Sequence, residues 1–191
     1  SAICYNNIAD VFSDVGHYDT AIKYCNKALS IRLNVLGEEH EDTITTYNSI
    51  AYNFYSIGDY NSAIEYYAKV VTGLERLLGA DHPKVASVIC NMGSAYGNLR
   101  NYDKALELQL RALDIRLASL GEMHADTATS YNNIGDIYLD TNEYDKALEY
   151  FQKALQIFKH AYGEVNESIY ITYNNISRAY NEQAKKLAIT K

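Results

Sequence analysis

The residues best suited to chemistry in this sequence are three histidines that recur at one constant interval, at His40, His82 and His124. Imidazole can bind zinc, but the ion needs several ligands within about 2.3 Å, usually from close sequence pairs. Histidines one repeat apart lie too far from each other to share an ion. The sequence also lacks a CxxC pair, a Gly-rich phosphate loop and a Gly-x-Ser-x-Gly turn. We therefore expect no metal, no cofactor and no enzymatic activity, and we interpret the histidines as link residues that bond to a helix end.

A second recurring row consists of four carboxamides and one hydroxyl, at Asn7, Ser49, Asn91, Asn133 and Asn175. Each of these residues directly precedes an Ile or a Met. A carboxamide can donate and accept hydrogen bonds at the same time, so it suits contact with a peptide backbone. The alternative is that these side chains tie neighbouring helices together or cap backbone groups.

The constant interval belongs to a repeat that covers the chain. The segment that starts at Tyr131 (YNNI) has counterparts that start at Tyr5, Tyr47, Ile89 and Tyr173, in register and without insertion. A period of this size, about 42 residues, marks a repeat architecture in which each unit contacts mainly its neighbours. We expect a single array with units at about 1–40, 41–82, 83–124 and 125–166, and a terminal helix at 167–191. Because the chain has no initiator Met and begins inside a repeat, we expect it to be a segment of a longer protein.

Each unit has the pattern of two helices, A and B. In the fourth unit, Tyr131, Ile134 and Tyr138 are three and four residues apart, which places them on one face of helix A. Gly163 ends helix B, and we expect it in the left-handed conformation. The A helices are predicted at 1–14, 42–56, 83–98, 125–139 and 167–186, and the B helices at 18–35, 60–77, 102–119 and 144–161.

Small and aromatic residues recur in the same register and predict the packing. Alanines on the B helices should allow close approach, and aromatic residues should fill the space between helices, at Phe12, Phe54, Tyr96, Tyr138 and Tyr180. Gly73 stands where other units carry Ile. An interior helical glycine costs about 1 kcal/mol relative to alanine, so the B helix at 60–77 is predicted to be the least stable.

The pattern resembles the tetratricopeptide repeat. The first unit shows it in Tyr5, Ile8, Ala9, Phe12, Gly16, Tyr18, Ala21 and Ala28. The ordinary repeat of that family is shorter, at about 34 residues. The longer unit here, with its Leu-Gly-x-x-His link, is similar to the repeats of kinesin light chains and their relatives. The resemblance implies an all-α fold, a right-handed α-solenoid of antiparallel helix hairpins with about nine helices.

The resemblance also implies a function, because A helices of this family line a concave groove that binds a peptide segment of a partner protein. The row at Asn7, Ser49, Asn91, Asn133 and Asn175 corresponds to the asparagine that grips the peptide backbone. One and two turns further along, we expect the groove to show Asp10, Tyr52, Ser94, Asp136 and Arg178, followed by Asp14, Ser56, Asn98, Asp140 and Glu182. The preceding residues, Asn6, Asn48, Cys90, Asn132 and Asn174, should face an adjacent helix or the groove edge.

The charge of this surface departs from the family pattern. Kinesin light chains receive acidic cargo motifs on basic groove residues, but Lys84 is the one basic residue of the predicted A helices before Arg178. We therefore expect a neutral to acidic groove that prefers a partner peptide bearing Lys or Arg, in the manner of a cargo adaptor. The alternatives are a self-associating solenoid, forming homo-oligomers through its end helices, and a regulatory arm of a larger enzyme.

The overall composition narrows the partners further. The net charge of −7 argues against nucleic acid and against anionic membrane surfaces, since both bind through clustered cations. Three cysteines without a close pair indicate free thiols, and no apolar run reaches the roughly 20 residues of a membrane span. These features favour a cytoplasmic location.

Overall fold

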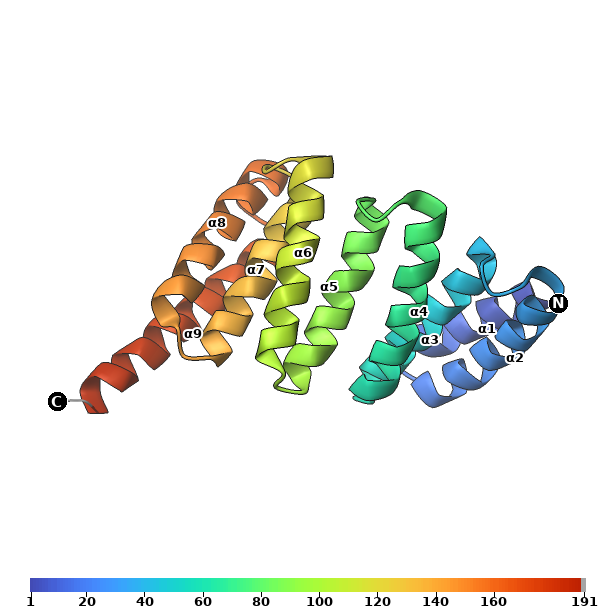
Figure 1. Ribbon diagram of the computed structural model, residues 1–191. Helices are drawn as coiled ribbons and strands as arrows, with labels where there is room; N and C mark the ends of the chain where they lie inside the picture. The colour runs from blue at the N-terminus through green and yellow to red at the C-terminus, as the bar shows by residue number, and fades with distance from the viewer. Residues whose placement is uncertain (190–191) are drawn as a thin grey trace. The chain divides into compact units, whose positions relative to one another are not determined.

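The computed structural model describes residues 1–189 and contains helices joined by short links. The described residues form nine helices (Figure 1): α1 (Ala2–Asp14), α2 (Tyr18–Leu36), α3 (Glu41–Ser56), α4 (Tyr60–Leu78), α5 (Pro83–Asn98), α6 (Tyr102–Leu120), α7 (Ala125–Asp140), α8 (Tyr144–Tyr162) and α9 (Glu167–Ile189). All nine lie at the predicted places, and the all-α solenoid architecture is confirmed.

The chain divides into two compact units, Ser1–Arg100 and Asn101–Lys191. In the first unit α1 packs on α2, α3 on α4, and the hairpins meet through α2 with α3 and α4 with α5. In the second unit α6 packs on α7, α7 on α8 and α8 on α9. The single continuous array remains a proposal.

Small side chains lie at the centres of these hairpins, as predicted. The recurring alanines Ala21, Ala63, Ala105 and Ala147 are fully buried, and so are Ala28, Ala112 and Ala154. Their missing bulk lets helix axes approach closely. The aromatic positions follow the prediction in part, because Phe12, Phe54 and Tyr138 each stack on a tyrosine of the following helix. Tyr180 does not, since it is 51% exposed.

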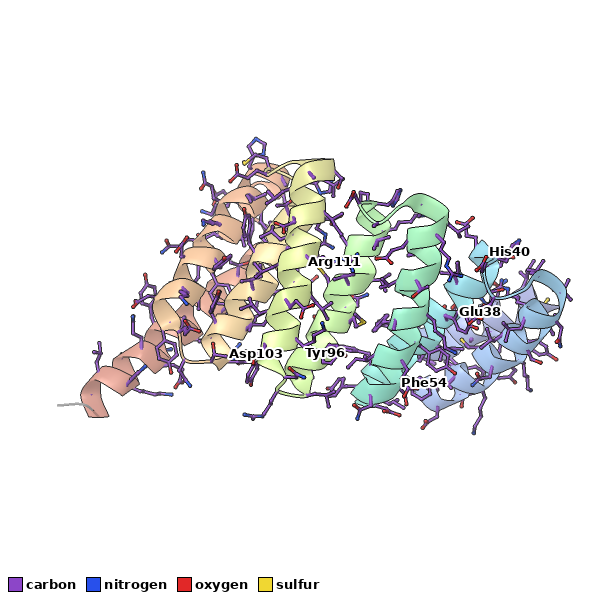
Figure 2. The ribbon with its side chains drawn as sticks, viewed as in Figure 1. Glu38, His40, Phe54, Tyr96, Asp103 and Arg111 are labelled. Atoms are coloured by element: carbon purple, nitrogen blue, oxygen red, sulfur yellow. The ribbon has the colours of Figure 1, made fainter. Side chains whose placement is uncertain are left out.

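The A helices after α1 each begin at a link residue whose side chain caps them. The Nδ1 atoms of His40, His82 and His124 each accept a hydrogen bond, at 3.1 Å, from the backbone N–H two residues later. Asn166 has the same role before α9, where Oδ1 accepts from the N–H of Ser168 at 2.8 Å. His40 is labelled in Figure 2, in the link before α3. The interpretation of these histidines as link residues bonded to a helix end is therefore confirmed.

The glycines that end the B helices adopt a backbone conformation that side chains disfavour. Gly37 has φ 85° and ψ 175°, and Gly121 has φ 86° and ψ 168°. The predicted left-handed helical conformation is therefore right in the sign of φ but wrong in ψ, which is extended. This region of backbone space is populated almost only by glycine, so the chain needs glycine here to turn into the link.

The links between hairpins exist in a polar and an apolar version. In the polar version a buried arginine of helix B reaches the start of the next helix A. Arg32 donates to the Asp42 carbonyl at 2.9 Å and also to the Thr46 hydroxyl, and Arg116 donates to the Asp126 carbonyl and the Ser130 hydroxyl, both at 2.8 Å. Helices α4 and α8 carry Leu74 and Phe158 at the equivalent places. The same two polar links have a threonine that donates to the carbonyl of the turn glycine. The link type thus alternates from one hairpin to the next.

Gly73 is buried at the contact between α4 and α3. A Cβ atom placed on it would lie 2.5 Å from Cδ1 of Ile44 and 2.7 Å from Cγ1. The glycine therefore admits the Ile44 side chain, which gives the residue a packing role that its helix propensity does not reveal. The lower stability of α4 stays a prediction.

Candidate functional site

The first unit contains a groove lined by α3 and α5, with α4 as its floor. Two cavities follow each other along it. The first, of about 230 Å³, is lined by Glu41, Ile44, Thr45, Asn48, Val70, Leu74, Lys84, Ser87 and Val88. The second, of about 180 Å³, is lined by Tyr52, Tyr55, Tyr67, Asn91 and Ser94. The two sets are about one helical turn apart on all three helices, so we treat them as one surface, the α3–α5 groove.

The first cavity combines an apolar floor with polar walls. Val70, Leu74 and Val88 contribute aliphatic carbon, while Glu41 and Lys84 contribute one charge of each sign. The Oδ1 atom of Asn48 is buried and has no hydrogen-bond partner among the described residues. A buried acceptor without a partner is costly, so a donor entering this cavity would relieve that cost.

The second cavity, which we call the tyrosine pocket, is lined by uncharged side chains. Tyr67 is 1% exposed, and burial raises the pKa of its phenol, with Tyr55 and Tyr52 adding to the rise. The hydroxyl therefore keeps its proton at neutral pH. The Tyr55 hydroxyl accepts a hydrogen bond from Nδ2 of Asn98 at 3.0 Å. Asn91 and Tyr52 are exposed at the mouth.

The structure brings together part of the predicted site in the first unit. Tyr52 and Asn91 meet in the tyrosine pocket, and Ser49 lies half-buried one turn before Tyr52 on α3. Predicted groove residues on α1 are exposed and line neither cavity: Asn7, Asp10 and Asp14. In the neighbouring row, Asn6 and Cys90 are buried and Asn48 is half-buried, as expected for residues that face an adjacent helix, but Asn174 in the second unit is exposed.

In the second unit, the predicted residues are engaged with each other and with neighbouring helices. Asn133 donates to Oε1 of Gln109 at 3.4 Å. Asn175 is 7% exposed and accepts from Nη1 of Arg178 at 3.4 Å. Asp140 is exposed at the end of α7. Asn133 thus ties α7 to α6, as in the alternative interpretation of the row, whereas the hydrogen bond of Asn175 stays within α9.

Asp136 is the most strongly perturbed carboxyl of the second unit. Burial raises its pKa to about 7, the negative charge of Asp140 raises it further, and the positive charge of Arg178 opposes the rise. Nδ2 of Asn132 donates to Oδ2 of Asp136 at 3.4 Å, while Oδ1 of Asn132 accepts from the Thr172 hydroxyl at 3.3 Å. A polar network thus joins α7 to α9 beneath the predicted row.

Comparison with known protein families places these helices in a known class. The model of the tetratricopeptide repeat matches residues 1–76, 58–118, 84–160 and 126–188, which together span nearly the whole chain. The chain belongs to the tetratricopeptide repeat family. It is therefore a protein–protein interaction scaffold of the repeat type. A comparison with curated proteins gave no match.

Solved structures with the same fold include other tetratricopeptide repeat proteins. BtubC (BKLC) from P. vanneervenii is 27% identical, with a TM-score of 0.77 over 87% of this chain and 66% of that chain. The nearly identical TPR-like repeats of a kinesin light chain from Podosopora anserina are 18% identical, with a TM-score of 0.78 over 97% of this chain and 88% of that chain. RapI, in its apo form, is 20% identical with a TM-score of 0.74 over 97% and 69% of the two chains. The last two likenesses concern the fold alone.

The groove was predicted from the A helices alone, so the residues of its floor were not predicted. Tyr67, Val70 and Leu74 come from α4, a B helix of the tetratricopeptide repeat. A signal was present, because the position of Tyr67 carries Cys25, Gln109 and Phe151 in the other units while the flanking alanine row stays almost constant.

Two further observations concern membranes and metals. Within the described residues, no helix has the length and apolar content that a membrane span requires. In that same part of the chain, no group of three His, Cys, Asp or Glu side chains is placed to hold a metal ion.

Proposed function

We propose that this tetratricopeptide repeat chain is a non-catalytic scaffold that binds a peptide segment of a partner protein in the α3–α5 groove. The observation that carries the proposal is the pairing of Tyr52 with Asn91 at the mouth of the tyrosine pocket. The groove offers aliphatic floor, an unpaired buried acceptor and exposed amide and hydroxyl groups along three helices. Between Glu41 and Tyr52, α3 rises by about 16 Å, enough for about five residues of an extended peptide.

A basic peptide fits the charge of this surface best. Asp10 and Asp14 on α1, and Glu41 and Asp42 on α3, are exposed, whereas Lys84 is the one basic residue on α1, α3 and α5. Opposite charge on a partner speeds encounter and disfavours acidic competitors. We propose a cytoplasmic cargo-adaptor role on the strength of the similarity to kinesin light chain-like repeats.

The test uses two matched threonines. Thr45 lies in the groove and Thr72 on α4 lies outside it, and both are exposed with a hydroxyl that donates to the carbonyl four residues earlier. Peptides selected from a random library on the wild-type chain should bind Thr45→Trp at least about tenfold more weakly, because the indole occupies the groove. Thr72→Trp should bind them as the wild type does.

Two results would contradict the proposal. Equal loss of affinity in both tryptophan variants would mean that the peptides bind elsewhere or that the fold is disturbed. A selected set rich in Asp and Glu would contradict the basic preference. Thr129→Trp, at the equivalent place in the second unit, tests whether α7 and α9 contribute, and with them the proposed single array.

A second candidate, self-association, is favoured by apolar side chains on the first and last helices. Ile3 and Val11 on α1 are 61% and 63% exposed, and Tyr170 and Tyr180 on α9 are 68% and 51% exposed. Exposed apolar patches often mark interfaces. Sedimentation equilibrium over a concentration series should then show a dimer that Val11→Lys or Tyr170→Lys dissociates. A monomer at every concentration would refute this candidate.

A further inference from the structure

We propose that the tyrosine pocket of the α3–α5 groove binds an arginine side chain of the partner segment. The proposal rests on the proposed peptide-binding function and specifies its anchoring residue. The pocket is lined by four residues whose side chains end in a hydroxyl and one whose side chain ends in a carboxamide: Tyr52, Tyr55, Tyr67, Ser94 and Asn91. These groups can all accept hydrogen bonds, and none of them carries a positive charge.

The buried tyrosine is the first observation that points to a ligand. Tyr67 is 1% exposed, and its hydroxyl makes no hydrogen bond within the described residues. The hydroxyl oxygen is not among the fully buried polar atoms that lack a partner in the described residues, so it is accessible from the cavity that the residue lines. An oxygen that lies in a cavity without a partner in its own chain is therefore placed to receive a donor from outside.

The second unit shows which group suits this place. A shift of two repeats converts Tyr52, Tyr67, Asn91 and Ser94 into Asp136, Phe151, Asn175 and Arg178. There Arg178 donates from Nη1 to Oδ1 of Asn175 at 3.4 Å, and its charge acts on Asp136. In the first unit, Ser94 stands at the position of Arg178, so the chain itself supplies no guanidinium there. The Asn91 side chain makes no hydrogen bond within the described residues. A partner's arginine would thus make in the first unit the contact that the chain's own arginine makes in the second.

Tyrosine rings hold cations elsewhere in the same chain. The Lys69 ammonium lies 5.1 Å from the ring centroid of Tyr47 and 5.5 Å from that of Tyr66. The Lys27 ammonium lies 4.8 Å from the centroid of Tyr24. The attraction of a cation to the ring face strengthens when water is excluded, as in a pocket with one fully buried ring.

Arginine fits the pocket better than lysine does. The guanidinium is planar, stacks on aromatic rings and carries five N–H donors in fixed directions, which match several acceptors at once. Lysine offers a compact, strongly hydrated charge, and its transfer into an uncharged pocket is more costly. The cavity of about 180 Å³ is several times larger than the ~10–15 Å³ that one water molecule needs on the same measure. A guanidinium and its adjoining methylene groups fit this space.

The experiment starts from peptides selected from a random phage library on the wild-type chain. We expect the enriched peptides to share an arginine, and its replacement by citrulline, which is isosteric and uncharged, should weaken binding at least about tenfold. Tyr67→Phe should weaken the arginine peptides by about the same factor, because it removes one hydrogen bond to a charged group. We expect the fold to tolerate this change, since Phe151 occupies the equivalent place in α8. Tyr66→Phe, one residue away in the outer pair with Tyr47, is the matched control and should leave binding unchanged.

The outcomes separate this inference from the function on which it rests. Two outcomes would overturn the arginine pocket and leave groove binding intact. In the first, the peptides lose affinity for Thr45→Trp but share no arginine. In the second, they lose affinity for Thr45→Trp but bind Tyr67→Phe as tightly as the wild type. Arginine peptides weakened equally by Tyr67→Phe and Tyr66→Phe would also overturn it. A library that yields no enriched peptide would refute the peptide-binding function and the pocket together.

Discussion

The polar links make a quantitative prediction about a buried charge. Arg32 is 6% exposed and donates to the Asp42 carbonyl and to the hydroxyl of Thr46. Hydrogen bonds to charged groups contribute about 1.5–3 kcal/mol each, so Arg32→Ala, which also leaves a cavity, should lower the free energy of unfolding by about 3–5 kcal/mol.

The next hairpin shows how the same link works without a charge. In the link between α4 and α5, Leu74 stands at the place of Arg32 and Val88 at the place of Thr46. The double variant Arg32→Leu/Thr46→Val therefore copies a solution that the chain already uses. Replacing buried polar contacts by well-packed apolar side chains of similar volume is often neutral or stabilising. We expect the double variant to unfold within about 1 kcal/mol of the wild type.

Urea unfolding followed by circular dichroism measures both variants, with the midpoint shift read at constant m-value. The single variant Arg32→Leu is the control, and it should fall between the other two because it leaves the Thr46 hydroxyl without its buried donor. If the double variant is as unstable as Arg32→Ala, the two link types are not interchangeable and the reasoning is refuted.

Three further predictions concern single positions. The pKa of Asp136 is raised from 3.8 to about 7 by burial, so its contribution to stability is fully present below pH 3.8 and is lost as the pH rises through 7. The free energy of unfolding of Asp136→Asn should therefore exceed that of the wild type by about 1–2 kcal/mol at pH 8. This gain is smaller than the ~1.36 kcal/mol per pKa unit that the full shift implies, because solvent screens part of the effect. In unfolding curves recorded near pH 4, the gain should vanish. His82→Ala should lower the free energy of unfolding by about 1 kcal/mol, because the cap of α5 is lost. His82→Asn should leave it nearly unchanged, because Asn166 caps α9 in the same way. Equal losses in the two variants would contradict the capping role. Gly73→Ala should destabilise by about 1 kcal/mol, because overpacking against Ile44 outweighs the gain in helix propensity. Ile44→Val removes Cδ1 but keeps Cγ1, so it should restore part of this loss in a double-mutant cycle. An additive cycle would rule out the contact with Ile44 as the cause.

The sequence predicted the helices because the repeat samples the same pattern several times. Spacings of three and four residues, turn glycines and link histidines all mark the same boundaries, and α5 lies where it was predicted. Where the prediction rested on one residue it was weaker. Gly73 looked like a defect of its helix, but its role depends on Ile44, which is far from it in sequence. The ψ angle of Gly37 depends on the route of the link, which periodicity does not encode.

The candidate site was predicted less completely, for a physical reason. Register identifies which residues share a helix face, and it correctly grouped Tyr52 with Asn91. It does not tell whether a neighbouring side chain occupies the space in front of them. Asn133 and Asn175 share the register of Asn91, yet Gln109 and Arg178 engage them. Occupancy of this kind depends on contacts between helices and needs coordinates.

The alternation of polar and apolar links determines how this chain can be shortened. Removal of a single repeat unit would join the arginine-bearing end of α2 to the start of α5, where Val85 and Val88 offer no hydroxyl to the buried guanidinium. Removal of two consecutive units joins α2 to the start of α7, where Ser130 supplies an acceptor hydroxyl like that of Thr46 and Thr127 supplies a donor hydroxyl like that of Thr43. The modular element for cutting and splicing is therefore a pair of hairpins, twice the length that the sequence period suggests.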